Sequence, residues 1–270
     1  MMAGAARRWW FWTARPVENY PSEQLTCWGH RGVPSQAPEN TLASFEAAIA
    51  AGVHGIELDV MESADGVVVV RHDFTLERTT DGAGLVRDHT YGELSRLNAA
   101  HHWDGDFPGQ QIPRLEEVLA LVPDGLWVNV ELKAHRWRST PLLPEVVAQL
   151  KKFGLLNRAM ISSFNPLWLL KIRQLEPRLP LAYLWWDVDV AWYLARPILL
   201  NLVRPEFFHP SLKLTTPKII ARAHRHGARI NVWTVNDRAQ VAALKAMGVD
   251  GIITDYPELV LTGEAKIKDH

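Results

Sequence analysis

The chain has a single cysteine, Cys27, among its 270 residues, so no disulfide can form within it. Cys27 lies in an apolar run, where a buried free thiol is the expected state and a reducing, cytoplasmic environment fits. The chain also lacks a long run of one charge, and its 29 Lys and Arg against 30 Asp and Glu leave a net charge of −1. Nucleic acid is therefore not an expected partner, and any affinity for phosphate has to come from a local site.

A long apolar run is missing as well, so the first residues do not match a signal peptide or a membrane-spanning helix. The aromatic run 9–12 ends within a few residues, at Thr13, Arg15 and Pro16. We interpret residues 1–24 as an aromatic and basic arm packed on the domain that follows. The alternative is a peripheral contact of its tryptophans with a membrane surface, and the sequence leaves both interpretations open.

Short β-rich runs recur along the chain with helical patterns between them. The runs fall at 25–29, 55–61, 126–132, 159–163, 181–186, 206–209, 228–234 and 251–254. Helical periodicity follows the first run, where Asn40 or Thr41 is the expected cap and Gly52 lies past the end, and recurs at 114–122, 143–153, 165–175, 216–226 and 236–247. Eight alternating units in a chain of this length predict one α/β domain, a TIM (β/α)8 barrel over 25–262, with a tail at 263–270.

A ninth β-rich run, 67–72, follows the second run after only four residues. A parallel crossover needs a dozen residues or more, so a β-hairpin with Asp65 and Gly66 in its turn is expected. The hairpin would bring Glu57 roughly opposite His72 at one rim of the barrel. Residues 73–113 then form a long insertion, of the kind that covers or shapes a site.

Acidic residues alternate with apolar ones in two of the predicted strands. In the run 56–60, Glu57 and Asp59 point to one side, and in the run 128–133 Glu131 and Lys133 do the same. In a barrel that side is the interior, where unpaired charges are costly, so the three carboxylates need a cation. Without a cysteine ligand they favour a hard ion, Mg²⁺ or Ca²⁺. The alternative is that Arg31 and Lys133 alone neutralise the acids.

Two histidines end strands at the same rim, His30 after the first run and His72 after the ninth. Either alone would usually be a structural hydrogen-bonding group. Two imidazoles that converge with three acids can divide proton transfer between nucleophile and leaving group. Arg31 adds a planar donor fork suited to phosphate oxygens, and the glycines on either side of His30-Arg31, Gly29 and Gly32, allow the backbone close to a ligand.

These residues belong to an ordered set of short strings that resembles the glycerophosphodiester phosphodiesterase family, within the phospholipase C-like phosphodiesterases. The strings are His30-Arg31-Gly32, Pro38-Glu39-Asn40-Thr41, Glu57-Leu58-Asp59-Val60, Asp65-Gly66, His72-Asp73, Arg78-Thr79-Thr80, Gly82 with Gly84, Glu131-Leu132-Lys133, Ser163-Phe164, Trp233-Thr234-Val235-Asn236 and Asp250-Gly251-Ile252-Ile253-Thr254-Asp255. One string would be common by chance, but the ordered set, from about 25 to about 258, is specific.

The resemblance implies a TIM barrel in which Glu57, Asp59 and Glu131 hold one divalent cation, Mg²⁺ or Ca²⁺. It also implies that His30 and His72 act as acid and base and that Arg31 and Lys133 contact the phosphate. The implied reaction hydrolyses a small glycerophosphodiester to glycerol 3-phosphate and an alcohol such as choline or ethanolamine. No pattern in the sequence specifies the head group or the oligomeric state.

Trp233 is expected to point into the barrel, where it would either line the glycerol or head-group pocket or simply fill the interior. The sequence departs from the family pattern mainly at 181–208, which is rich in Trp and aliphatic residues. That segment packs against the N-terminal arm or forms an apolar rim that touches a membrane. The second case favours a lysophospholipase D-like enzyme acting on lipids that keep an acyl chain. A non-catalytic phosphodiester-binding module is a third hypothesis, which the paired histidines and acids argue against.

Overall fold

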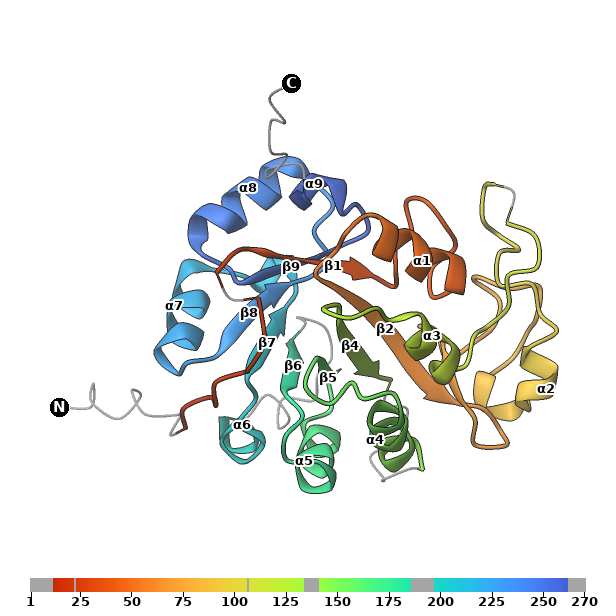
Figure 1. Cartoon of the computed structure of the whole chain (residues 1–270), viewed down its shortest axis with the longest axis horizontal. Coiled ribbons are helices and arrows are strands. Elements are labelled where there is room, and N and C mark those ends of the chain that lie inside the picture. The colour runs from red at the N-terminus through yellow and green to blue at the C-terminus, as the bar shows by residue number, and fades with distance from the viewer. Residues whose placement is uncertain (1–11, 22, 106, 134–140, 186–196, 262–270) are drawn as a thin grey trace.

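The computed structural model describes residues 12–21, 23–105, 107–133, 141–185 and 197–261 (Figure 1). Eight parallel strands in this part of the chain form a closed barrel, because β1 pairs with both β9 and β2. The strands are β1 (Thr26–His30), β2 (Gly55–Glu62), β4 (Trp127–Leu132), β5 (Ala159–Ser163), β6 (Leu181–Trp185), β7 (Phe207–Pro210), β8 (Arg229–Val232) and β9 (Gly251–Thr254). The predicted TIM barrel is confirmed, and the strand ends agree with the predicted runs to within two residues.

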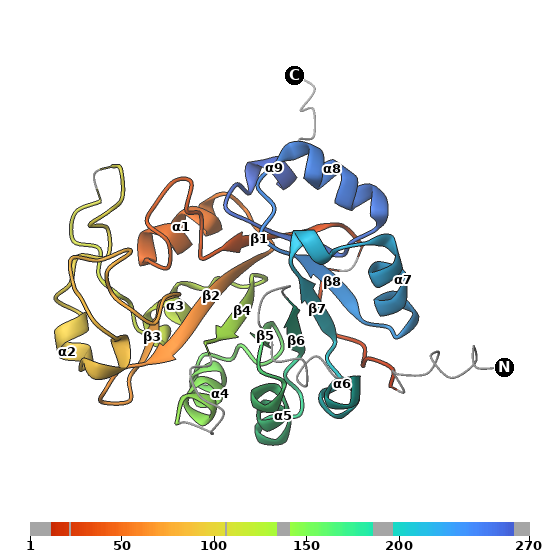
Figure 2. The same ribbon diagram turned by 180° about the vertical axis from the view of Figure 1, so that it is seen from behind.

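Helices surround the barrel on its outside, as Figures 1 and 2 show from opposite sides. They are α1 (Leu42–Ala50), α3 (Leu115–Leu121), α4 (Leu142–Lys152), α5 (Pro166–Leu175), α6 (Pro197–Val203), α7 (Pro217–Arg225), α8 (Arg238–Met247) and α9 (Glu258–Leu261). Of the two expected caps of α1, Thr41 is the one used, since its side chain accepts from the Ser44 N–H. The apolar faces of the helices cover the outward valines, leucines and isoleucines of the strands.

The predicted β-hairpin is present, with β3 (Val68–Val70) antiparallel to β2. Its register is one residue away from the expected pairing of Glu57 with His72, because Val60 pairs with Val70 and the ladder ends there. The insertion that follows contains η2 (Val86–Asp88) and α2 (Tyr91–Leu94) and lies at the side of the barrel beyond α1 and α3 (Figure 1). A small apolar cluster of its own, which includes Leu76 and Leu94, holds the insertion against the hairpin.

The lower end of the barrel, where the strands begin, is filled by aromatic side chains. Trp28, Trp127 and Phe207 from three strands pack inside, and Tyr20 from the N-terminal segment closes the lower end against them. The Tyr20 hydroxyl lies 3.0 Å from Thr26 Oγ1 and donates to Asn231 Oδ1 at 3.3 Å. The N-terminal segment therefore contributes Tyr20 to the core inside the barrel.

Trp12 packs on the outer side of the barrel, with its ring 6.2 Å from that of Phe208. This contact joins the N-terminal segment to β7. The remaining aromatic residues of the arm, and Trp186, Trp192 and Tyr193, lie outside the described residues.

The 3₁₀ turn η3 (Leu212–Leu214) follows β7. Within the described ranges, no helix combines the length and the apolar character needed to cross a membrane.

Candidate active site

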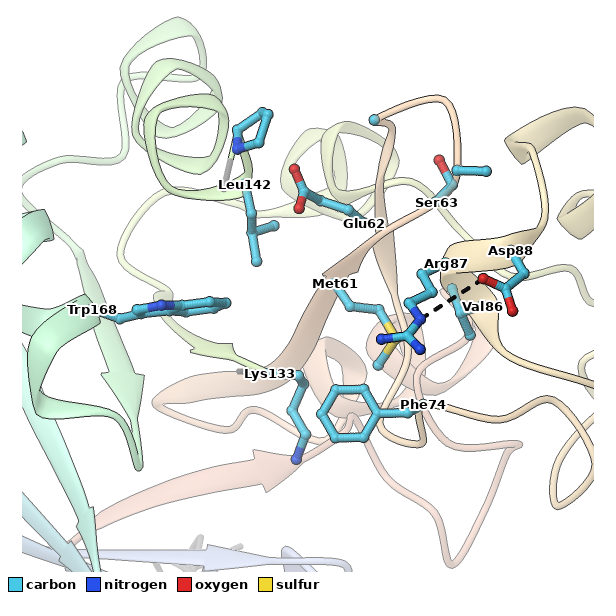
Figure 3. Close-up of a pocket in the computed structure, with 13 residues that line it drawn as sticks. Met61, Glu62, Ser63, Phe74, Val86, Arg87, Asp88, Lys133, Leu142 and Trp168 are labelled. Atoms are coloured by element: carbon cyan, nitrogen blue, oxygen red, sulfur yellow. Dashed lines mark ion pairs between the residues drawn. The ribbon is translucent and has the colours of Figure 1, made fainter. Parts of the chain in front are cut away.

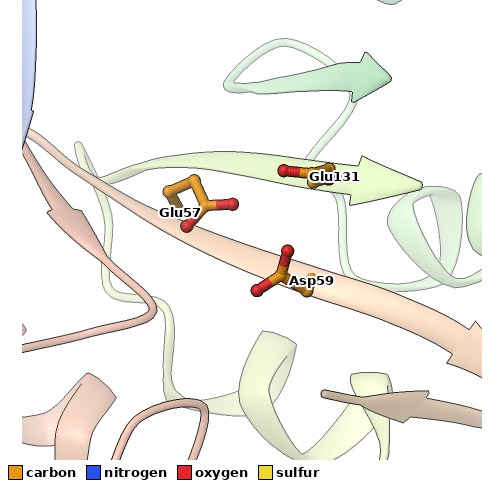
Figure 4. A group of neighbouring side chains, drawn as sticks. All are labelled: Glu57, Asp59 and Glu131. Atoms are coloured by element: carbon orange, nitrogen blue, oxygen red, sulfur yellow. The ribbon is translucent and has the colours of Figure 1, made fainter. Parts of the chain in front are cut away.

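Three carboxylates gather inside the barrel, Glu57 and Asp59 from β2 and Glu131 from β4 (Figure 4). One oxygen of each lies within 4.8 Å of the others. They share a face because residues two apart on a strand point the same way, and the strand register sets Asp59 beside Glu131. Their exposed fractions are only 4%, 1% and 8%. Three negative groups are thus held together almost out of contact with water.

The neighbouring cations do not stabilise the three carboxylates equally. Burial, together with the neighbouring charges of Asp59 and Glu131, raises the pKa of Glu57 well above its usual range. Burial opposes ionisation of Asp59 too, but Lys133 and Arg31 outweigh it and hold the pKa of Asp59 well below its usual range. The positive charge of Lys133 and Arg31 is therefore not sufficient to balance Glu57 as well. A divalent cation that prefers oxygen ligands, Mg²⁺ or Ca²⁺, fits this all-carboxylate donor set.

Two cationic side chains flank the carboxylates. Lys133 Nζ lies 2.9 Å from Glu131 Oε1 and 3.5 Å from Asp59 Oδ1. Arg31 Nε lies 3.4 Å from Asp59 Oδ2, and the Arg31 backbone N–H donates to Glu57 at 3.1 Å. Burial opposes the charge of Lys133, but Glu131 and Asp59 raise the pKa of its ammonium above the usual value. Lys133 and Arg31 therefore lie as charged groups beside the three carboxylates.

The turn between β1 and α1 brings Arg31 to this position. Arg31 has a left-handed backbone with φ 54°, and Gly32 follows with φ 88°. A Cβ at Gly32 would lie 2.6 Å from the Ser44 carbonyl oxygen, and one at Gly29 would lie 2.5 Å from the Gly32 carbonyl oxygen. Close backbone packing therefore requires both glycines.

His30 and His72 each have a carboxylate on the same ring nitrogen. His30 Nδ1 lies 2.6 Å from Asp255 Oδ1, and His72 Nδ1 lies 2.7 Å from Asp73 Oδ1. An ionised carboxylate only accepts hydrogen bonds, so Nδ1 of each ring carries the proton and Nε2 is left to exchange one. The Cα of His30 pairs with that of Glu57 across β1 and β2, which sets its ring at the level of the acidic cluster.

Several polar residues without a predicted role contact these groups. Asn40 donates to Asp59 at 3.0 Å, and Asn236 donates to Asp255 at 2.6 Å. Glu39 accepts from Arg31 at 3.0 Å. Asp73 directly follows His72 in the sequence, so a contact between the two could have been predicted. Glu39, Asn40, Asn236 and Asp255 all belong to the strings that resemble the family, which was the sequence signal for them. The contact of Asp255 with His30 joins residues 225 positions apart, so no local pattern indicated that pairing.

Trp233 lies just past β8 and is partly buried. Its indole N–H donates to the His209 carbonyl oxygen at 2.7 Å, and its ring meets Phe164 edge to face at 5.7 Å. His209 is wholly buried inside the barrel beside Asn231, and burial lowers its pKa to about 3. His209 is therefore neutral and structural, while Trp233 is fixed at the barrel mouth by its hydrogen bond.

The chain matches the model of the glycerophosphoryl diester phosphodiesterase family over residues 30–259. It belongs to this family. The matched range begins at His30 and includes all eight residues predicted for the site. As a family member the chain is a glycerophosphodiester phosphodiesterase, which is a phosphoric diester hydrolase.

Relatives and solved structures agree with this assignment. A glycerophosphodiester phosphodiesterase of Bacillus altitudinis is 37% identical over 234 residues, covering 85% of this chain and 94% of the relative. A putative glycerophosphoryl diester phosphodiesterase of Silicibacter pomeroyi superposes with a TM-score of 0.80 at 27% identity, over 93% and 94% of the two chains. A phosphodiesterase of Oleispira antarctica, solved with the product sn-glycerol-3-phosphate, has a TM-score of 0.76 at 28% identity, over 89% and 97%.

A pocket of about 450 Å³ opens beside Lys133 (Figure 3). Phe74 from the insertion and Trp168 from α5 lie on opposite sides of it, and Met61 and Leu142 add further apolar surface. The lining also includes charged groups: Glu62, and Arg87 and Asp88, which form an ion pair at 3.8 Å. This glycerophosphodiesterase thus has apolar space directly next to one of the cations of its site.

Proposed function

We propose that this chain hydrolyses small glycerophosphodiesters to glycerol 3-phosphate and an alcohol, with one divalent cation, Mg²⁺ or Ca²⁺, at Glu57, Asp59 and Glu131. The observation that carries the proposal is the buried carboxylate triad flanked by two carboxylate-bound histidines, in a chain of this family. The product seen in the related Oleispira antarctica phosphodiesterase, sn-glycerol-3-phosphate, supports the same substrate class.

The two histidines divide the proton transfers of the reaction. With Nδ1 bound by Asp255 or Asp73, each ring uses Nε2, one to take a proton from the attacking oxygen and the other to protonate the leaving alkoxide. Arg31 and Lys133 contact the phosphate oxygens and stabilise the charge that develops there. A divalent cation, when bound by the three carboxylates, adds Lewis-acid stabilisation of the same charge. Trp233, fixed at the barrel mouth, lines the pocket for the glycerol moiety.

The test is a metal-reconstituted assay on glycerophosphocholine, glycerophosphoethanolamine and glycerophosphoinositol. We expect release of glycerol 3-phosphate that stops in excess EDTA and returns when Mg²⁺ or Ca²⁺ is added. Undiminished hydrolysis in excess chelator would refute the metal site, and no release from any of the three substrates would refute the substrate class. An Asp59→Asn variant, which loses one ligand charge, serves as the inactive control.

A second candidate substrate is a lysophospholipid that keeps one acyl chain. The apolar pocket next to Lys133 favours it, since a phosphodiester held by Lys133 would have Phe74, Met61 and Trp168 within reach of an attached chain. A volume of about 450 Å³ lies within the usual range of small-molecule sites. The same bond would be hydrolysed, which releases the head-group alcohol and leaves glycerol 3-phosphate that still carries the acyl chain.

Lysophosphatidylcholine and glycerophosphocholine, assayed side by side, separate the two candidates. If the pocket holds the chain, Phe74→Ala lowers kcat/KM for the lysophospholipid by roughly 10-fold and leaves glycerophosphocholine unaffected, because burying several methylene groups contributes on the order of 1–2 kcal/mol. Equal effects on both substrates, or no turnover of the lysophospholipid, would exclude the second candidate. Co-sedimentation with liposomes tests in the same preparation for the membrane contact considered for the Trp-rich segments.

A further inference from the structure

A chain of ion pairs connects Arg31 to His72 around the outside of the carboxylate cluster. Arg31 Nη1 donates to Glu39 Oε1 at 3.0 Å, and Glu39 in turn accepts from Arg78 at 2.6 and 2.9 Å. The remaining donor of the Arg78 fork, Nε, donates to Asp73 Oδ2. The other oxygen of Asp73 holds His72 Nδ1.

The geometry distinguishes this chain of contacts from ordinary surface ion pairs. Arg78 binds Glu39 with two parallel hydrogen bonds and Asp73 with a third, which fixes the plane of its guanidinium. The Glu39 side chain is only 19% exposed. Burial raises the pKa of Glu39, but the hydrogen bonds from Arg78 and the charge of Arg31 more than offset this and hold it below its usual value. Each carboxylate is therefore ionised and shared between two partners.

The chain of contacts joins two segments that lie far apart in the sequence. Glu39 lies in the turn before α1, in the same turn as Arg31, whereas Arg78 and Asp73 lie in the insertion after β3. Glu39 and Arg78 are 39 positions apart in the sequence. The β2–β3 ladder ends at Val70, and one further backbone bond runs from the Arg71 N–H to the Asp59 carbonyl oxygen, two residues before Asp73. The fork of Arg78 ties Asp73, and through it the His72 ring, to Glu39 in the turn before α1.

We propose that Arg78 and Glu39 are positioning residues: Arg78 fixes the orientation of the His72 imidazole through Asp73, and Glu39 couples that orientation to the placement of Arg31. Neither residue touches the reacting atoms. Arg78 therefore affects kcat through the proton transfer at His72. Glu39 affects kcat through Arg78 and KM through Arg31. This inference rests on the proposed function, because it assumes that His72 and Arg31 act on a phosphodiester.

The kinetic test compares Arg78→Ala and Glu39→Gln with wild type on glycerophosphocholine. Loss of a residue that orients a site group typically costs roughly 10- to 100-fold in activity, and we expect Arg78→Ala to show this loss in kcat with KM nearly unchanged. Glu39→Gln is expected to lower kcat and raise KM. Arg78→Lys should recover little, because an ammonium cannot bind two carboxylates as the planar fork does.

A double-mutant cycle shows whether Arg78 acts through Asp73. We expect an Asp73→Asn background to retain part of its activity, and in it Arg78→Ala should change kcat by no more than about twofold, because its partner carboxylate is already gone. The same loss in both backgrounds would overturn the proposal. The matched control is Arg178→Ala, which removes another bidentate pair, to Glu176, and should leave kcat unchanged.

Imidazole nitrogen NMR tests the positioning without any turnover. In wild type, His72 should give the signals of one tautomer with the proton on Nδ1, and in Arg78→Ala these should broaden or shift toward a tautomer mixture. An unchanged His72 signal in Arg78→Ala would refute the inference even if the enzyme is active. If instead wild type has the expected NMR signature but hydrolyses no glycerophosphodiester, the proposed function fails and the positioning contact stands.

Discussion

His30 and Asp255 lie at the ends of the first and last strands of the barrel, and their side chains meet with Nδ1 and Oδ1 2.6 Å apart. Asp255 also accepts a hydrogen bond from Asn236 at 2.6 Å. Burial raises the pKa of Asp255, but the contacts with His30 and Asn236 more than offset this and keep it below its usual value. The closure of the barrel thus supplies the carboxylate that orients His30.

Replacing Asp255 with Asn keeps the size of this side chain but removes its charge. The amide can also donate, so it no longer dictates that His30 carries its proton on Nδ1. We expect a loss in kcat of roughly 10- to 100-fold with KM little changed. Steady-state kinetics and a melting curve measure this, and a kcat within twofold of wild type would contradict the orienting role.

The histidines themselves should matter more than the carboxylates that orient them. Acid or base catalysis contributes on the order of 10²- to 10⁴-fold, so His30→Ala and His72→Ala are each expected to lose at least that range in kcat. Both side chains lie at the rim, so the melting temperature should change little. Near-normal turnover in either variant would remove that residue from the proton-transfer scheme.

Glu57→Gln tests whether a metal relieves the repulsion among the carboxylates. In chelated protein the pKa of Glu57 is raised in the folded state, so the folded state keeps a proton that the unfolded chain has lost. Stability therefore falls as pH rises from the unfolded-state value of about 4.3 through the raised folded value. The variant should remove this dependence and melt higher than chelated wild type, by about 2–4 °C per kcal/mol gained.

With Mg²⁺ or Ca²⁺ added, Glu57→Gln should instead melt at a lower temperature than wild type, because the variant has lost a charged ligand. Melting curves at pH 5 and pH 8, with EDTA and with metal, measure both effects. Glu46→Gln, on the exposed face of α1, is the control and should change neither curve. A variant that melts below wild type in EDTA would show that Glu57 is already balanced without a cation.

Tyr20 tests whether the N-terminal segment is part of the fold. Its ring fills the lower end of the barrel, and its hydroxyl contacts Thr26. Tyr20→Ala should lower the free energy of unfolding by about 3–5 kcal/mol, as for other large aromatic truncations, and Tyr20→Phe by about 1 kcal/mol. Denaturant unfolding measures both, and Tyr20→Phe should leave kcat unchanged because the site lies at the opposite end.

The interior residues of the site were predictable because alternation along a buried strand is a local property. Glu57 and Asp59 are two apart and flanked by apolar residues, so they had to share one face, and Glu131 with Lys133 repeats this pattern. The hairpin followed from the short Asp65-Gly66 connection. The observed register is one residue away from the predicted one because the turn closes between Ser63 and Val67, with the Ser63 N–H bonded to the Val67 carbonyl oxygen and Gly66 at φ 81°.

The contacts that orient the site could not be predicted in the same way. Asp255 reaches His30 only because β9 closes on β1, and Glu39 reaches Arg78 only because the insertion folds back along α1. The sequence left both Asn40 and Thr41 as possible N-caps of α1. In the structure Thr41 is the cap, and the Asn40 side chain instead donates a hydrogen bond to Asp59. Each of these choices depends on which residue a distant segment brings near.

Local patterns in the sequence were therefore enough to predict the barrel, the shared inward face of Glu57, Asp59 and Glu131, and the strand-end positions of His30 and His72, because periodicity and strand-end position act within a few residues. The tertiary fold was needed to bring Asp255 to His30, to join Glu39 to Arg78, and to place the Tyr20 hydroxyl against Asn231. These pairs lie 225, 39 and 211 positions apart in the sequence, and they form only once the closed sheet and its insertion have set the distances.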